Sequence, residues 1–119
     1  MMQFLPWLFG REANSMRNVL PQRRRAETIE MQHGGQNNTF QVTIGYYADG
    51  SIGEVFVSGA KAGSNVDALC RDAAIMLSLA LQHGTPLDLM KHAITREGDG
   101  APSTIIGAVV DKLTNKGGR

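Results

Sequence analysis

The segment with the most chemical potential is a glycine-bearing loop, Gly59-Ala60-Lys61-Ala62-Gly63-Ser64-Asn65. It joins a predicted strand to the start of a predicted helix, where backbone N–H groups are unpaired and the helix dipole is positive. Lys61 stands beside these groups, so the loop predicts a seat for an anion such as a nucleotide phosphate. The candidate binding residues are Gly59, Lys61, Gly63, Ser64 and Asn65.

This loop is not a Walker phosphate-binding motif, because the lysine is misplaced and the loop is too short. A second interpretation stays open. The glycines can serve only to make a tight turn from strand to helix, with Lys61 in solvent.

An arginine run, Arg23-Arg24-Arg25, is the other basic feature. It is either a solvated linker or a contact for phosphates or for an acidic partner. The net charge of the chain is only +1, so no global field draws it to nucleic acid or to a membrane.

Residues suited to catalysis or metal binding are scattered. His33, His83 and His92 show no paired ligand spacing, and Cys70 is the only cysteine, so we expect no catalytic site, no metal site and no cofactor. His83 lies near a predicted helix C-terminus, where it complements the dipole. Cys70 lies on an apolar helix face and is expected to be an inert core residue. A single cysteine fits a reducing, cytoplasmic location.

The strands that must position the loop are predicted from alternation. Residues 27–33 alternate weakly, and residues 40–46 alternate clearly from Phe40 to Tyr46. Asp49-Gly50 predicts a two-residue type I′ turn. With that turn at the centre, Ala48 faces Ser51. The same register pairs Ile44 with Val55 and Val42 with Val57.

A long apolar helix follows, from Asn65 to about His83, with Ser64 as its N-cap and Gly84 just after its end. The residues predicted to form its buried face are Val66, Leu69, Cys70, Ala73, Met76, Leu77 and Ala80. Two shorter helices are predicted after it, one capped by Thr85 with Pro86 at its first position and one capped by Ser103. The expected fold is α+β, with a small antiparallel sheet of about three strands on a long central helix.

The domain organisation follows from these elements. We predict a flexible N-terminal arm over residues 1–25, one domain over 26–116 and a frayed tail over 117–119. The arm begins with the apolar stretch Met1 to Phe9, which is too short to span a bilayer, so no membrane association is expected.

Several segments from Arg23 to Thr95 together resemble the TSCPD domain. They include GSIGEVFVSG at 50–59, KAGS at 61–64, DAA at 72–74, SLALQHG at 78–84 and HAITR at 92–96. This domain is found at the C-terminal end of vitamin B12-dependent ribonucleotide reductases and as short free-standing proteins. The Thr-Ser-Cys-Pro-Asp signature that names it is absent, and the chain instead reads Gly100-Ala101-Pro102-Ser103-Thr104.

The resemblance implies a role in ribonucleotide reduction without independent reductase activity, because the catalytic barrel cannot fit in 119 residues. We therefore expect a non-catalytic accessory or regulatory domain that binds a nucleotide, a phosphate-bearing ligand or a B12-dependent reductase as protein partner. The alternative is a small nucleic-acid-binding module that uses Arg17, the arginine run and Lys61 as phosphate contacts. Homo-oligomerisation is left open.

Overall fold

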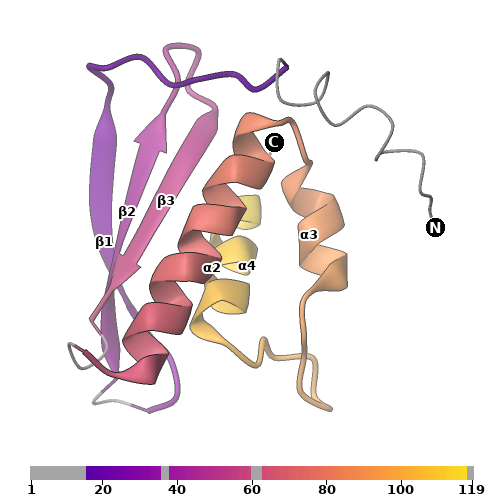
Figure 1. The fold of residues 1–119 in the computed structure, drawn as a ribbon. Helices are drawn as coiled ribbons and strands as arrows, with labels where there is room; N and C mark the ends of the chain where they lie inside the picture. Colours follow the sequence, from indigo (N-terminus) through magenta and orange to yellow (C-terminus); the bar gives the residue numbers. More distant parts are fainter. Residues whose placement is uncertain (1–15, 36–37, 60–62, 118–119) are drawn as a thin grey trace.

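The computed structural model describes residues 16–35, 38–59 and 63–117. The elements are β1 (Ala26–Gln32), β2 (Thr39–Tyr46), β3 (Ile52–Ser58), α2 (Asn65–Gln82), α3 (Leu87–Ala93) and α4 (Ile105–Gly117). The strands form one antiparallel sheet in the order β1-β2-β3 (Figure 1). The predicted α+β fold is confirmed, and its long helix has 18 residues.

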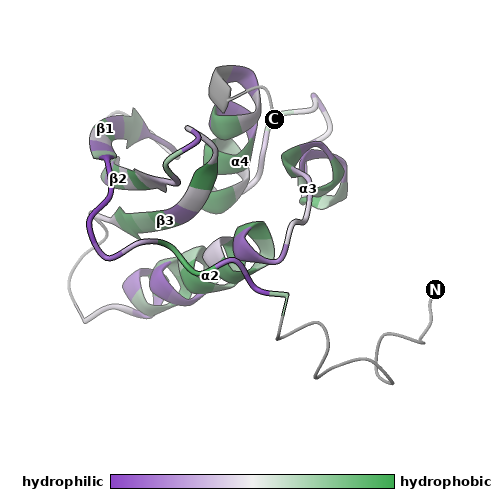
Figure 2. Cartoon of the chain, turned by 90° about the horizontal axis from the view of Figure 1, so that it is seen from above, coloured by the Kyte–Doolittle hydropathy of each residue, from purple (hydrophilic) through white to green (hydrophobic). Residues whose placement is uncertain are grey.

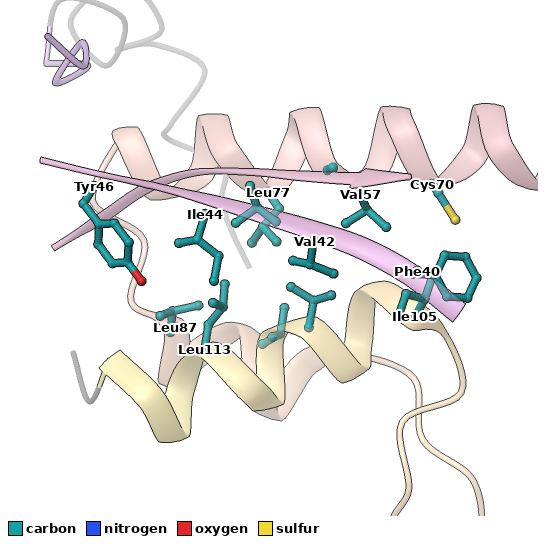
Figure 3. Packing of buried hydrophobic residues seen from close by; sticks show 14 residues of the cluster. Phe40, Val42, Ile44, Tyr46, Val57, Cys70, Leu77, Leu87, Ile105 and Leu113 are labelled. Atoms are coloured by element: carbon teal, nitrogen blue, oxygen red, sulfur yellow. The ribbon is translucent and has the colours of Figure 1, made fainter. Parts of the chain in front are cut away.

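The core lies between the sheet, α2 and α4. Alternate residues of β2 point inward, and they meet side chains from β3, α2 and α4 (Figure 3). The fully buried members include Val42, Ile44, Val55, Val109 and Leu113. In the view from above, α2 runs beside β3, α4 lies between the sheet and α3, and α3 is the helix farthest from the sheet (Figure 2).

The register of the second hairpin is as predicted, but its turn is not. Ile44 pairs with Val55 and Val42 with Val57. The predicted type I′ turn, with Asp49 and Gly50 as its two central residues, is wrong. The N–H of Gly50 bonds the carbonyl of Tyr47, so the central residues are Ala48 and Asp49, and Gly50 follows them at φ 89°. This is a type I turn closed by a left-handed glycine.

The offset that this turn introduces is corrected by a bulge. The N–H of Tyr47 bonds the carbonyl of Ser51, so the predicted pairing of Ala48 with Ser51 is wrong by one residue. Tyr46 then pairs with Ile52 and Gly45 with Glu54, which leaves Gly53 as the extra residue. A Cβ at Gly53 would lie 2.6 Å from the side chain of Leu20, so glycine lets the N-terminal segment pack on the bulge.

Both ends of α2 follow the sequence prediction. The Ser64 hydroxyl accepts a hydrogen bond from the N–H of Asp67 at 3.1 Å, as an N-cap does. At the other end Gly84 has φ 88°, and the N–H of Thr85 reaches back to the carbonyl of Ala80. Together with the bond from Gly84 to Leu81, this is a Schellman C-terminus.

The caps of the two later helices differ from the prediction. The N-cap of α3 is Pro86 and not Thr85, and it makes no side-chain capping bond. At α4 the hydroxyl of Thr104 accepts from the N–H of Gly107, whereas the hydroxyl of Ser103 donates to Glu97. Ser103 is therefore held by the preceding loop and is not the cap.

The buried face of α2 is rotated from the predicted one. Cys70 and Leu77 are buried as expected, but Val66, Leu69 and Met76 are 55%, 60% and 71% exposed. The residues that turn inward with Cys70 and Leu77 are Asp67, Ala74, Ser78 and Gln82. The helix is apolar on most sides, so periodicity alone did not distinguish its inner from its outer face.

The reason for this rotation is the free edge of β3. The Ser78 hydroxyl accepts from the N–H of Val55 at 2.8 Å and contacts the carbonyl of Val55 at 3.1 Å. The Gln82 amide donates to the carbonyl of Gly53 at 2.9 Å. Because unpaired backbone groups at a buried edge are costly, two polar side chains face inward in place of apolar ones.

We expect Leu77→Ala to lower the free energy of unfolding by about 2–5 kcal/mol, because it removes a core side chain that is 6% exposed. Urea denaturation measures this. The matched control is Met76→Ala on the neighbouring, exposed position, which should change stability by less than about 0.5 kcal/mol. Equal effects of the two substitutions would contradict the observed orientation of α2.

We expect Ser78→Ala to cost about 1–3 kcal/mol, because the peptide groups of Val55 lose their edge partner in a buried position. Thermal and urea unfolding measure the loss. Ser58→Ala, on an exposed residue at the end of the same strand, is the control and should be close to neutral. A neutral Ser78→Ala variant would show that the sheet edge does not depend on this hydroxyl.

Candidate functional site

The candidate anion loop is described at its two ends. Gly59 adopts φ 126°, and a Cβ there would lie 2.6 Å from the carbonyl oxygen of Thr39, so only glycine fits. Gly63 also has positive φ, and Ser64 caps α2. Lys61, the predicted ligand cation, lies outside the described residues.

A carboxylate already occupies the first turn of α2. Asp67 is only 8% exposed, and its side chain accepts from Nε of Arg71 at 3.0 Å. A negative charge at this position stabilises the helix dipole. Any anion bound by Ser64 and Asn65 would therefore share the positive end of the helix with Asp67.

The arginine run is divided among different partners. Nε of Arg24 lies 2.5 Å from one carboxylate oxygen of Glu54, and Nη2 lies 3.1 Å from the other, a bidentate pair. Arg25 stacks its guanidinium 4.1 Å from the centre of the Tyr46 ring. All three arginines line a hollow of about 350 Å³ beside the β2–β3 turn. The role of this hollow as a contact surface stays a prediction.

Tyr46 links the core to this basic hollow. Its hydroxyl donates to the carboxylate of Glu27 on β1. Burial, followed by the bond and charge of Glu27, raises the pKa of Tyr46 to about 12. The phenol therefore stays protonated at neutral pH and acts as a hydrogen-bond donor that ties β1 to β2.

The structure separates the two predicted binding elements. Gly59 lies against Thr39 and Phe40 at the start of β2, whereas Arg25 lies on Tyr46 at its end. An eight-residue strand separates them by roughly 24 Å. The loop and the arginine run therefore do not form one phosphate site.

The histidines and the cysteine are placed as structural residues. Ring nitrogens of His83 and His92 lie 2.9 Å and 2.8 Å from the carbonyls of Leu79 and Asp88 on their own helices. Cys70 is buried, and its pKa is raised by burial and by Asp67, which disfavours the reactive thiolate. Within residues 16–35, 38–59 and 63–117 there is no cluster of metal-ligating side chains.

The surface feature that the sequence reasoning missed is apolar. Phe56 on β3 is 55% exposed, and Ile75 and Leu79 on α2 are 54% and 40% exposed. These three side chains line a groove of about 560 Å³ between β3 and α2. The available signal was Phe56 itself, an aromatic residue on the outward side of the strand alternation.

Comparison with protein families explains the arrangement. The model of the TSCPD domain matches residues 13–114. The chain belongs to the TSCPD domain family. The matched residues include the three strands, α2, α3 and most of α4. No solved structure matches the TSCPD domain of this chain significantly.

The similar curated proteins are vitamin B12-dependent ribonucleotide reductases. That of Agrobacterium fabrum is 37% identical over 79 residues, which are 66% of this chain and 6% of the reductase. Those of Bradyrhizobium diazoefficiens and Rhodopirellula baltica are 35% and 32% identical over 66% and 62% of this chain. This TSCPD domain therefore spans only 6–7% of the length of these relatives.

None of the helices in the described part of the chain combines the length and the apolar character needed to cross a bilayer.

Proposed function

We propose that this TSCPD domain is a non-catalytic accessory or regulatory domain of ribonucleotide reduction, which acts by binding a protein partner of the B12-dependent reductase type. The proposal rests on how little of the reductase is similar to this chain, which is 6% of its length. A similarity confined to 6% of a large enzyme concerns a small module, and the rest of the enzyme has no counterpart in this stretch.

The groove between β3 and α2 is the surface that suits such a partner best. Phe56 is an exposed aromatic residue, and aromatic anchors in apolar pockets dominate binding energies at protein interfaces. Ile75 and Leu79 form the wall beside it. Around them the outer sheet surface is polar, with Thr28 bonded to Thr43. An apolar centre with a polar rim is the usual anatomy of a protein interface.

Phe56→Ala should weaken binding of this chain to a purified B12-dependent ribonucleotide reductase by about 10- to 100-fold, the range of a hot-spot truncation. Biolayer interferometry with the immobilised reductase measures it. Leu89→Ala is the matched control, because Leu89 is 61% exposed on α3, away from the groove, and affinity should be retained. No binding at about 100 µM would refute the partner proposal. Equal losses for both variants would place the interface elsewhere.

The loop from Gly59 to Asn65 is proposed as the ligand element of the same domain. The cap by Ser64 leaves further N–H groups of the first turn for an anion, while Asp67 opposes it. Phosphate binding there would let nucleotide levels act on the accessory role. The nucleic-acid alternative gains no specific support, because Arg24 and Arg25 are engaged within the fold.

Calorimetric titration with ATP, dATP and inorganic phosphate tests the loop. Lys61→Ala should weaken binding by about 1–2 kcal/mol, the value of one charge-assisted hydrogen bond. Stability should be nearly unchanged, which thermal unfolding checks. If none of the three ligands binds below millimolar concentration, the loop is a strand-to-helix turn only, and the protein-partner proposal stands or falls on its own experiment.

A further inference from the structure

The outer side of α2 carries an apolar stripe, here called the α2 stripe, of Val66, Leu69, Ala73, Met76 and Ala80. Val66, Leu69 and Met76 are each more than half exposed. The helix lies at the border of the domain, and no described element covers its side away from the sheet (Figure 2). At about 100° per residue, the centre of the stripe lies about 120° around the helix from Ile75 and Leu79, and Leu79 borders the stripe as the i+3 neighbour of Met76.

The spacing of the α2 stripe is that of a helix-pairing seam. Its members follow one another at intervals of three, four, three and four residues, which is the heptad spacing of two packed helices. The stripe contains no charged residue. A pairing of two such stripes therefore buries no unpaired charge.

The sizes along the α2 stripe are complementary to the same stripe reversed. When a second copy of α2 is placed antiparallel in heptad layers, Leu69 lies against Ala80 of the second copy. In the same alignment Ala73 lies against Met76 of the second copy. These two layers each pair a large side chain with a small one, and the two-fold symmetry repeats them, while Val66 lies opposite His83 at the end of the helix. Alternating large and small residues is what close packing of facing helices requires.

An apolar groove beside the α2 stripe extends this match. It has a volume of about 590 Å³ and lies between the first half of α2 and the start of α4. Its lining includes Leu69, Cys70 and Ala73 from α2 and Ile105 from α4. In the alignment above, Met76 of the second copy lies opposite Ala73, which lines this groove, and a flexible methionine suits an irregular apolar space.

From these observations we infer that the α2 stripe is a homodimer interface, in which two copies of this chain pair their α2 helices antiparallel about a two-fold axis. The inference does not rest on the proposed function, which uses the neighbouring flank of α2 that faces Phe56. A helix of 18 residues is about 27 Å long. One helix pair is smaller than a standard interface, so we expect a dissociation constant on the order of 10 µM.

Sedimentation equilibrium of the full chain from about 1 to 100 µM tests the dimer. Met76→Glu should raise the dissociation constant at least about 100-fold, because it places a charge in an apolar layer. Leu69→Glu should do the same by an independent substitution. Leu89→Glu on α3 is the matched control and should leave the dimer intact. Both stripe positions are exposed in the single chain, so circular dichroism should show unchanged folding.

Four results would overturn the inference. The first is a monomeric wild-type chain at about 100 µM, which would mean that another segment or another protein covers the stripe. The second is a dimer that survives both Met76→Glu and Leu69→Glu, which would place the contact elsewhere. The third is equal dissociation by Leu89→Glu. A dimer weakened by Phe56→Ala as strongly as by Met76→Glu would equally exclude the α2 stripe as the interface.

Discussion

The orientation of α2 depends on hydrogen bonds between its side chains and the free edge of β3. The Ser78 hydroxyl accepts from the N–H of Val55, and its one proton lies between the carbonyls of Val55 and Ala74. The Gln82 amide donates to the carbonyl of Gly53. Gln82 also holds the N-terminal segment, because its side-chain oxygen accepts from Arg17 and its carbonyl from the N–H of Asn18. One helix face thus closes the sheet edge, joins the core and fastens residues 17 and 18.

Turning these polar residues inward has a consequence for the surface. The same rotation that buries Ser78 and Gln82 turns Leu69 and Met76 outward, and it leaves Ile75 beside Phe56 on the other flank. Large exposed apolar patches on folded domains commonly mark interaction sites. The two flanks differ in shape, since one is a heptad stripe and the other a groove with an aromatic residue. They therefore suit two different partners.

Membership in the TSCPD family relates this small domain to one short segment of the B12-dependent ribonucleotide reductases. Among the described residues, Arg24 is paired with Glu54, and Cys70 is buried in the core. The phenol of Tyr46, with its pKa raised to about 12, is a structural donor. The exposed apolar surfaces of α2 and β3 are the features on which the proposed accessory role rests.

The sequence by itself determined what depends on neighbouring residues. Alternation in β2 and β3, with a turn placed at Asp49-Gly50, predicted the pairing of Ile44 with Val55, which holds because the bulge at Gly53 cancels the offset of the actual turn. The Ser64 cap and the Gly84 terminus of α2 were predicted because capping is local. Only the tertiary structure decided the type I turn with its bulge at Gly53, where Leu20 packs from a distant segment. It also decided which face of α2 is buried, because that choice rests on bonds between Ser78 and Val55, 23 positions apart. Helical periodicity carries no information about such long-range partners.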